Sequence, residues 1–584
     1  MTQNTISDIF GVYMTPFSSL STVNQDREHW QYRLLESSLF LGSILFLLGF
    51  VLAAYLFPVG ASLFLIIYSF LWLLKAFLNV IYTLYSYKQF NRWNLVNWTR
   101  LINNYHNSEK TNQTLIDLLV KNNNKLDFND KLENDIEVYN ANIGTKFANP
   151  EEIYNVAVFA TYNEGSEVLA KSLNCLYRSG WYLDKLIVTV SQEGRLGLSE
   201  NESIYDQINQ LDDVVVHSLD TLSNQDLASL ELSSTKLNVF FTQHPDGLIG
   251  EIKGKASNED WGARQIYRLT QAKKINSDHI LVTSLDADSH IAPYFFHNLV
   301  FRYCLTPDRA RCGFQPMHSY SNNFFDTGVF PRLVATQTTW FNSTNLAVES
   351  QMAFFAIYSL PMSVLVEVDF WVKDVIGEDY MIFAKCLTHY KGDFRIVPHF
   401  GIFEGDAIEA DDIVEEVLFQ YKQLQRWAWG GVEGFPYLFK RLFLTSESKD
   451  IKWTTKIKWT FLKYSNHFFW STTPIIFSVG ALVPMALHGS SYTSSVIASN
   501  LSFFLVMFSW FSYIFVATFG YLTIFFLGRR ATGFKRLSLA QIGQILLQSI
   551  LSPLIFGFMA LPALDAQCRG FLGKYMGYWV TPKK

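Results

Sequence analysis

The sequence has few charged residues. Asp, Glu, Lys and Arg make up 17% of the 584 residues, against about 25% in an average soluble domain. Hydrophobic residues make up 49% and aromatic residues 16%. So much ring surface with so little charge excludes disorder and argues against a wholly soluble protein. The mean hydropathy of only +0.10 also excludes a chain that lies in lipid throughout. A membrane protein with a large polar domain remains.

The sequence has no excess of basic residues either. Lys and Arg number 47 against 52 Asp and Glu, for a net charge of −5, so no nucleic-acid partner is expected. The 5 cysteines are scattered and never form a Cys-x-x-Cys pair. This pattern argues against a disulfide framework and a thiolate zinc site, and it favours buried free thiols in a reducing cytoplasm.

Long apolar runs lie near both ends of the chain. In the N-terminal membrane region, 1–100, the runs 40–57 and 61–84 carry one charge, Lys75, and are separated at Pro58. A helix crosses the hydrocarbon core with about 20 apolar residues, so two transmembrane helices are expected here. Lys75 either snorkels to the interface or makes a contact inside the bundle.

A polar, Asn-rich linker is expected at 101–150. In 151–436, short apolar runs alternate with helical stretches, which predicts an α/β domain with a mostly parallel sheet. In such a sheet, ligands bind at the carboxyl ends of the strands. The expected strands are Asn155–Ala160, Leu186–Val190, Val214–His217, Val239–Thr242 and Ile280–Ser284, and the expected helices include Gly165–Arg178 and Ala263–Lys274.

The C-terminal region, 437–584, begins with Lys, Arg and Trp interleaved between Lys440 and Lys463. This segment suits a helix on the membrane surface or a solvated cationic face. Apolar runs at about 468–487 and 501–527 predict spans. A third, at 540–564, either crosses or is an interfacial or re-entrant helix. Basic residues in 528–536, and none in 488–500, place the central domain in the cytoplasm.

The strongest chemical signal is Asp286-Ala287-Asp288, which follows the expected strand Ile280–Ser284 after one residue. Two carboxylates at a strand end suit a hard divalent cation such as Mg²⁺ or Mn²⁺. A cation there would offset the charge of a diphosphate leaving group. Asp-x-Asp alone is a weak signal because loops are rich in aspartate, so the context decides.

Two polar segments in the first half of the domain give part of that context. Thr161-Tyr162-Asn163-Glu164 follows the first expected strand. It either holds a base and a ribose or is a helix N-cap with a capping acid. Lys253–Asn258, which contains Lys255, is basic and expected to be flexible, so it either reaches phosphates or is a solvated loop.

Two more segments lie in the second half. Gly377-Glu378-Asp379 precedes an amphipathic run and supplies either a general base for an acceptor hydroxyl or an acidic helix N-terminus. The i, i+3, i+4 spacing of Gln423, Arg426 and Trp427 places them on one helical face. Arg can bind phosphate and Trp can stack on a sugar. The alternative is an interfacial Trp beside a snorkelling Arg.

In this order the motifs resemble those of the membrane-embedded family-two glycosyltransferases, which include cellulose, chitin and hyaluronan synthases. Asp286-Ala287-Asp288 resembles their metal-binding DxD, Gly377-Glu378-Asp379 their TED, Gln423-x-x-Arg426-Trp427 their QxxRW and Lys255-Ala256-Ser257-Asn258 their KAGN. The resemblance covers about 155–427. It implies an α/β GT-A catalytic domain inserted between N-terminal and C-terminal transmembrane helices.

The resemblance also implies residue roles. Asp379, beside Glu378, is the expected catalytic base, and Asp286 and Asp288 are the expected ligands of Mg²⁺ or Mn²⁺. The expected donor-binding residues are Thr161, Tyr162, Glu164, Glu193, Lys255, Asp286 and Arg426, and the expected acceptor-binding residues are Gln423 and Trp427. Glu193 stands in a turn that is an acidic DDG in the family, which leaves the nucleobase open. Gly377 replaces a Thr, with the acidic pair retained.

The predicted function is inverting, metal-dependent transfer from a nucleotide sugar, with a UDP-sugar favoured, to a growing polysaccharide that is exported through the membrane helices. Transfer to a lipid or lipid-linked acceptor without processivity is the alternative. A transporter or scaffold with an inactive domain is disfavoured because Asp286, Asp288 and Asp379 are present. The expected partners are the donor, a glycan or lipid acceptor and membrane lipids. The Asn- and Lys-rich linker favours a bacterial inner membrane.

Overall fold

The structure is a computed structural model of the 584-residue chain. It describes residues 22–105, 149–162, 164–489 and 537–579, with scattered residues in 107–115, at 139 and in 492–515. Most of the expected linker and most of the expected span at 501–527 lie outside the described residues. Asn163 and the basic residues of 528–536 lie outside them too.

A nine-stranded mixed sheet with the order β3-β4-β2-β1-β5-β8-β7-β9-β6 forms the centre of the polar domain. Strands β1 to β5 are the ones that the sequence predicted, and they pair with one another in parallel. Strand β8 runs antiparallel to both β5 and β7. The strands are β1 Tyr154–Thr161, β2 Leu186–Glu193, β3 Val214–Ser218, β4 Leu237–His244, β5 Ile280–Leu285, β6 His290–Ile291, β7 Cys312–Ser319, β8 Tyr358–Pro361 and β9 Arg395–Glu404.

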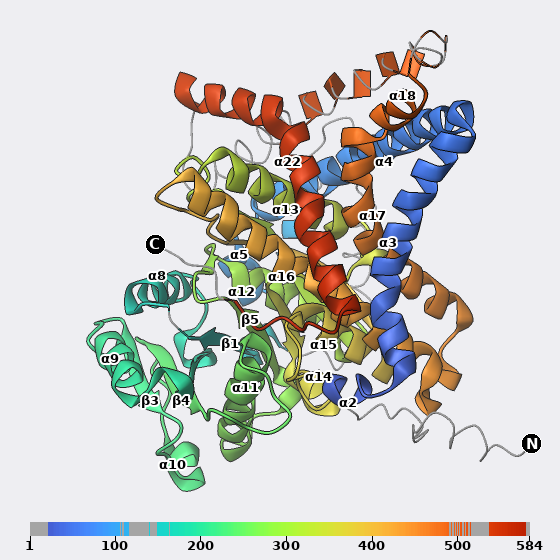
Figure 1. Ribbon diagram of the computed structural model, residues 1–584. Helices are drawn as coiled ribbons and strands as arrows, with labels where there is room; N and C mark the ends of the chain where they lie inside the picture. Colours follow the sequence, from blue (N-terminus) through green and yellow to red (C-terminus); the bar gives the residue numbers. More distant parts are fainter. Residues whose placement is uncertain are drawn as a thin grey trace, which may run out of the picture.

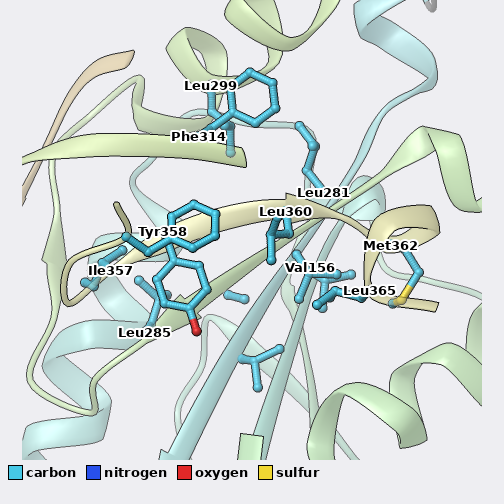
Figure 2. Packing of buried hydrophobic residues seen from close by; sticks show 14 of the residues in the cluster. Val156, Leu281, Leu285, Leu299, Phe314, Ile357, Tyr358, Leu360, Met362 and Leu365 are labelled. Carbon is cyan, nitrogen blue, oxygen red and sulfur yellow. The ribbon is translucent and has the colours of Figure 1, made fainter. Parts of the chain in front are cut away.

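The core of this domain gathers around β5 and β8. Figure 2 shows Leu281 and Leu285 of β5 beside Tyr358 and Leu360 of β8, with Phe314 of β7 above them. All of these side chains are at most 1% exposed. The Tyr358 hydroxyl accepts a hydrogen bond from Trp371 Nε1 at 2.6 Å, so the one polar atom of this ring is satisfied in the core. The core therefore fixes the strand after which Asp286 and Asp288 stand.

Helices pack on the sheet and connect its strands. Helix α11 packs on β1, β2 and β4, helix α12 on β9, and helix α13 on β7. The described helices of the domain are α5 Trp98–Asn103, α8 Ser166–Tyr177, α9 Leu198–Asn209, α10 Asn224–Ser229, α11 Lys255–Ala272, α12 Phe295–Leu305, α13 Val329–Leu346, α14 Met362–Glu367, α15 Glu378–His389 and α16 Ile413–Phe439. One prediction is wrong here. Lys255–Asn258 is not a flexible loop but the buried first turn of α11.

Among the residues that the structure describes, two helices are long and apolar enough to cross a membrane, α3 Trp30–Leu56 and α4 Pro58–Trp93. They contain the predicted runs 40–57 and 61–84, and α4 begins at Pro58, where the sequence predicts a break. In the same part of the chain, up to two bent pairs of helices are also long and apolar enough if each pair counts as one span. The first pair is α17 Trp453–Val479 with α18 Leu482–His488, bent by 52°. The second is formed by the two halves of α22 Leu539–Phe571, bent by 60°.

Helices α3, α4, α17 and α22 lie together on one side of the sheet domain, with the short α2 Val23–Asp26 below α3 (Figure 1). Helix α16 joins the two parts because it contacts α3, α17 and α22 as well as α15. The bent α22 faces the domain with its glutamines, since Gln548 donates to Thr336 Oγ1 of α13 at 3.0 Å. This contact does not decide between a crossing and a re-entrant helix.

The basic segment between Lys440 and Lys463 does not form a separate helix. It begins with a π-helical turn, Lys440–Leu444, and continues into α17. Lys440 and Lys463 are at most 7% exposed, so these cations face the protein interior rather than solvent. A simple solvated cationic face does not describe the segment. The 5 cysteines are free thiols, and Cys304, Cys312 and Cys386 are buried.

Candidate active site

A cavity of about 1160 Å³ lies between the sheet domain and the long apolar helices, among them α4 and α17. Every site residue predicted from the sequence lines it: Thr161, Tyr162, Glu164, Glu193, Lys255, Asp286, Asp288, Glu378, Asp379, Gln423, Arg426 and Trp427. These residues come from separate segments of the chain. The fold therefore brings together what the sequence shows only as scattered motifs.

The carboxyl ends of three parallel strands form one wall of the cavity. Thr161 ends β1, Glu193 ends β2, and Asp286 follows β5 directly. The acidic turn after β5 is held by hydrogen bonds: the Asp286 N–H donates to Ser289 Oγ at 3.0 Å, and Ser172 Oγ donates to the Ala287 carbonyl at 2.7 Å. Asp288 is 6% exposed and Asp286 is half-buried.

Lys255 connects this turn to the loop that carries the expected base. Its Nζ lies 2.9 Å from Asp286 Oδ1 and 2.9 Å from Glu378 Oε1, and 3.5 Å from Glu259 Oε1. Burial raises the pKa of Glu378 above its usual range, with Lys255 opposing the shift. Burial also raises the pKa of Glu259 to about 8, and its Oε2 has no hydrogen-bond partner among the described residues.

The N-terminus of α11 adds backbone donors beside the same carboxylates. Its first helical residue is Lys255, and no side chain caps the helix at Gly254. Exposed N–H groups at a helix start favour anions such as phosphates. Asn258, one turn further, does not face a ligand with its amide: it donates to the carbonyls of Thr161 at 3.1 Å and Ser191 at 2.8 Å. Asn258 thereby holds the ends of β1 and β2 to α11.

Asp286 and Asp288 fit a divalent-cation site in which the substrate supplies the remaining ligands. Among the described residues, no group of three or more His, Cys, Asp or Glu side chains is arranged to hold a metal ion. Mg²⁺ commonly uses only one or two protein carboxylates together with the phosphates of its substrate and water. Two carboxylates on one cavity wall, next to Lys255 and a helix N-terminus, match that kind of site.

The side chains expected to hold a nucleobase make more contacts with other side chains and with the backbone than the sequence indicates. Glu193 forms an ion pair with Arg195, and burial raises the pKa of Glu193. The Arg195 guanidinium also lies 3.6 Å above the ring of Tyr162. Glu164 accepts a hydrogen bond from the Tyr162 N–H at 2.7 Å, which is a local turn contact. Arg195 was not predicted, because one arginine in a surface turn gives no signal in the sequence.

Asp379 is held at the start of α15. Its Oδ2 accepts the N–H of Ala356 at 3.1 Å, and its Oδ1 accepts the N–H of Tyr380 at 2.6 Å. The carboxylate is half-buried and lines the cavity. It is therefore fixed by backbone donors while it remains open to a ligand.

The helical face predicted for Gln423, Arg426 and Trp427 is turned into the cavity. Arg426 Nη1 donates to the Tyr578 hydroxyl at 2.8 Å, and Arg426 Nε has no hydrogen-bond partner among the described residues. Nearby Trp429 is 0% exposed, so it is a core residue and not part of an interfacial Trp belt. Tyr578 was not predicted because nothing in the sequence links it to a helix so far upstream.

The far end of the cavity lies among the membrane helices. Its wall contains aromatic side chains of α4 and α17: Trp72, Phe77, Phe469, Trp470 and Phe477. Two cations stand among these rings. Lys75 lies 4.6 Å from the Trp72 ring, and Lys463 lies 3.4 Å from the ring of Tyr380. For Lys75 the sequence left open snorkelling or a contact inside the bundle, and the structure shows a contact with the Trp72 ring. The end of the cavity at the acidic strand ends and the end among the aromatic rings are therefore one space.

Residues 281–527 match the protein family described as Glycosyl transferase family group 2. This glycosyltransferase match contains Asp286-Ala287-Asp288, Asp379 and the Gln423–Trp427 segment. The mixed sheet with an acidic turn after β5 is the GT-A-like fold that the sequence predicts. No curated protein sequence matches the chain.

Two solved structures show distant similarity to the chain. One is the mannosyltransferase PcManGT from Pyrobaculum calidifontis in complex with GDP-Man and Mn²⁺, at 12% identity and a TM-score of 0.38, covering 73% of this chain and 95% of that one. Another is S. aureus TarS 1-349 in complex with UDP-GlcNAc, at 11% identity and a TM-score of 0.29, covering 68% and 91%.

Proposed function

We propose that the protein is an inverting, metal-dependent glycosyltransferase that extends a polysaccharide with sugars from a nucleotide-sugar donor, a UDP-sugar first among them. The observation that carries this proposal is the single cavity of about 1160 Å³, which contains both the acidic strand ends and an aromatic wall among the membrane helices. A donor that enters from the domain and an acceptor that enters from the membrane side can meet there.

The donor diphosphate belongs between Lys255, the start of α11 and Arg426. Arg426 supports this placement because it offers an unpartnered Nε–H inside the cavity, and a guanidinium binds phosphate oxygens in a fork. Asp286 and Asp288 would hold Mg²⁺ or Mn²⁺, which offsets the negative charge of the leaving diphosphate. Tyr162, with Arg195 above its ring, offers a surface for the base.

The transfer step follows from the position of Asp379. An acceptor hydroxyl oxygen attacks the anomeric carbon of the donor sugar from the face opposite the diphosphate. The new C–O bond forms as the bond to the phosphate oxygen breaks, the nucleoside diphosphate leaves with that electron pair, and the hydroxyl proton passes to the Asp379 carboxylate. One such displacement inverts the configuration. Arg426 and Lys255 stabilise the charge that develops on the leaving group.

The acceptor belongs near Trp427 and Gln423, which lie on the same face as Arg426. An indole ring can stack on a sugar, and the rings of Trp72 and Trp470 continue this type of surface towards the membrane. These rings favour a glycan chain that leaves among the helices. A second candidate, a lipid or lipid-linked acceptor, is favoured by the aliphatic part of the same wall, which includes Leu73 and Val80.

The test is a donor screen on the detergent-solubilised protein with Mn²⁺ or Mg²⁺, which measures nucleoside diphosphate release and product size. A long polymer from one donor supports the polysaccharide proposal, and a short lipid-linked product supports the second candidate. Asp379→Asn should reduce turnover by at least about 100-fold while nucleotide binding and thermal unfolding stay unchanged. Unchanged turnover in this variant would remove Asp379 from the mechanism.

A further inference from the structure

Glu433 stands behind the loop that carries the expected base. It lies on α16, two turns after Arg426, and is 2% exposed. Its Oε2 accepts the N–H of Ile376 at 2.9 Å and the N–H of Gly377 at 3.4 Å. These two residues directly precede Glu378 and Asp379. The carboxylate therefore holds the backbone from which the base projects.

This contact holds the two residues just before a helix. Helix α15 begins at Glu378, and Gly377, its N-cap residue, has no side-chain cap hydrogen bond. The first N–H groups of a helix need partners from outside the helix, and a carboxylate is favoured there by the helix dipole. Glu433, which lies on helix α16, accepts hydrogen bonds from the amides just before the start of α15. The loop is thus fixed to α16, which also carries Arg426.

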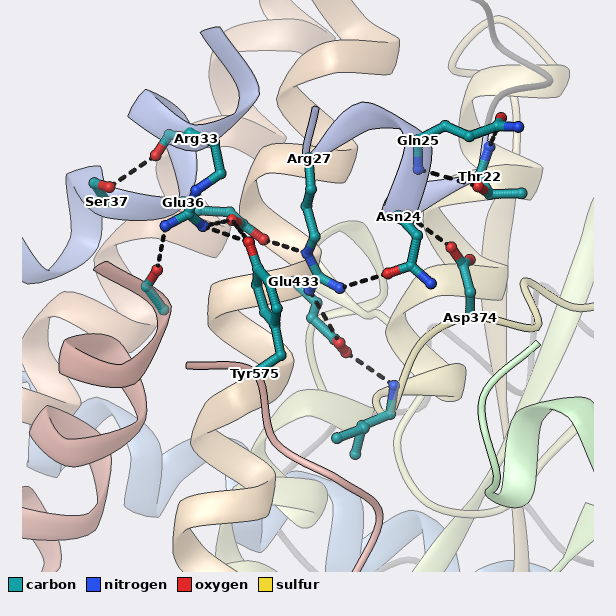
Figure 3. Close-up of polar contacts among 12 residues, drawn as sticks. Thr22, Asn24, Gln25, Arg27, Arg33, Glu36, Ser37, Asp374, Glu433 and Tyr575 are labelled. Atoms are coloured by element: carbon teal, nitrogen blue, oxygen red, sulfur yellow. Dashed lines mark hydrogen bonds and ion pairs between the residues drawn. The ribbon is translucent and has the colours of Figure 1, made fainter. Parts of the chain in front are cut away.

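Glu433 is in turn held by the N-terminal segment. Arg27 Nη2 lies 3.4 Å from Glu433 Oε1, and Arg27 Nε donates to Glu36 Oε1 of α3 at 2.8 Å. Figure 3 shows Arg27 between the two carboxylates. The two oxygens of Glu433 therefore make separate contacts, with Oε1 facing Arg27 and Oε2 facing the loop.

Two further contacts join the same N-terminal segment to the region around the loop. The Asn24 N–H donates to Asp374 Oδ2 at 2.8 Å, two residues before Ile376. Lys440 Nζ lies 2.6 Å from Asp26 Oδ2, and both side chains are at most 1% exposed. The segment from Asn24 to Glu36 thus holds both the base loop and the end of α16.

We infer that Glu433 is a positioning residue for sugar transfer: it sets the place of Asp379 through the Ile376 and Gly377 backbone, and Arg27 fixes Glu433. The inference rests on the proposed function. Asp379 is restrained on its other side by the Ala356 N–H at 3.1 Å. Without Glu433 the carboxylate would keep its contacts with the Ala356 and Tyr380 amides, but the backbone before it would lose the attachment to α16 that aligns it for the attack. A displacement of about 1 Å in a reacting group can cost about 100-fold in rate.

The test compares Glu433→Ala, Glu433→Gln and Arg27→Met in the donor assay. Glu433→Ala should lower kcat by about 10- to 100-fold and change the Kd for the nucleoside diphosphate much less. Glu433→Gln keeps an oxygen for the two amides and should recover most of that loss. Arg27→Met removes the ion pair but keeps the amide contacts, so it should lower thermal stability more than kcat.

Hydrogen–deuterium exchange gives a readout that does not depend on activity. The peptide that contains Ile376 and Gly377 should exchange faster in Glu433→Ala and near the wild-type rate in Glu433→Gln. Equal losses of kcat in Glu433→Gln and Glu433→Ala, or a loss in kcat that follows the loss of stability in all three variants, would overturn the positioning role. So would unchanged exchange in Glu433→Ala.

Asp379→Asn in the same assay separates this inference from the proposed function. If the wild type turns over a donor and Asp379→Asn does not, the proposed base stands whatever the Glu433 variants do. If Asp379→Asn keeps the wild-type rate, the proposed base fails, and with it a positioning role exerted through Asp379. A Glu433→Ala variant that does not fold leaves Glu433→Gln and Arg27→Met to decide.

Discussion

The Tyr578 hydroxyl accepts a hydrogen bond of 2.8 Å from the Arg426 guanidinium, although 152 positions separate the two residues. Tyr578 belongs to the tail that follows α22, and its ring lies against the start of α11. A Cβ added at Gly254 would come within 3.0 Å of that ring. The tail therefore meets both groups that we expect to bind the donor diphosphate, the arginine and the helix N-terminus.

Tyr578→Phe should tighten donor binding. The Tyr578 hydroxyl and a phosphate of the nucleotide sugar compete for the Arg426 guanidinium. Removing the hydroxyl therefore frees one N–H group of Arg426 for the phosphate, at the cost of one hydrogen bond. Since hydrogen bonds to charged groups contribute about 1.5–3 kcal/mol and part of this returns through solvent, we expect the Kd of a nucleoside diphosphate to fall about 2- to 10-fold. Isothermal titration calorimetry measures the effect.

Tyr575→Phe is the matched control for that experiment. The Tyr575 hydroxyl accepts from Arg33 at 2.8 Å and lies 3.3 Å from Glu36, outside the cavity. Its loss should leave nucleotide affinity unchanged. Weaker binding in Tyr578→Phe would mean that the hydroxyl supports the donor instead of competing with it.

Removal of divalent metal should stop nucleoside diphosphate release, and Mn²⁺ or Mg²⁺ should restore it. Asp288→Asn should lower turnover at saturating metal by at least about 100-fold, because a metal contributes several kcal/mol to the stabilisation of a leaving group. Asp278→Asn, before the start of β5, is the control and should keep wild-type turnover. Full activity with a chelator present would exclude the proposed metal site.

Glu259 predicts a pH dependence of stability. Its folded-state pKa is raised from 4.5 to about 8 by burial. The folded chain therefore binds more protons than the unfolded chain between these values. The contribution of Glu259 to the free energy of unfolding is therefore fully present below pH 4.5 and is lost as the pH rises through about 8. Melting temperatures of the wild type should fall across this range, and those of Glu259→Gln should fall less.

Asp226 should affect the pH dependence of the melting temperature in the opposite direction, which Asp226→Asn tests in the same measurement. Hydrogen bonds from Ser223 lower the pKa of Asp226 below 3.8, so its contribution is present above that pH and is lost in more acid solution. The substitution should therefore lower the melting temperature above that pH and leave it unchanged in more acid solution, where Asp226 is protonated. If Glu259→Gln and the wild type show the same slope between pH 5 and pH 8, Glu259 carries no buried proton.

Gly431→Ala should destabilise the contact between α16 and α17. An added Cβ would lie 2.3 Å from the His467 ring, so one of the two helices must shift. Overpacking of this kind costs about 1–3 kcal/mol. Gly430→Ala is the neighbouring control, since a Cβ there meets nothing within 4 Å. A thermal unfolding series in detergent should separate the two variants, and equal melting temperatures would contradict the packing argument.

The sequence predicted the first half of the sheet better than the second. Strands β1 to β5 are runs of Val, Ile, Leu and Phe, which alternate with helices and so indicate parallel strands. Strands β7 and β9 contain Gln, His, Gly and Pro between their apolar residues, and β8 spans only four positions, Tyr358–Pro361. Their burial comes from helices α12 and α13 and not from a local pattern.

The site residues could be predicted because each belongs to a short motif with its own chemistry. Arg195, Tyr578 and Glu433 were missed for a physical reason. Each acts through a partner that the fold supplies: the ring of Tyr162, the guanidinium of Arg426, or the amides of Ile376 and Gly377. The partners of Tyr578 and Glu433 are distant in the chain, and no periodicity or spacing records such a contact.

The contact between Tyr578 and Arg426 also bears on how the protein is made. When α16 has left the ribosome, every predicted site residue has been synthesised, yet the tail that touches Arg426 does not exist. Domains generally fold in the order of synthesis. A nascent chain can therefore present an open donor site before α22 is inserted, and the finished site is assembled only when the last helix packs on α16.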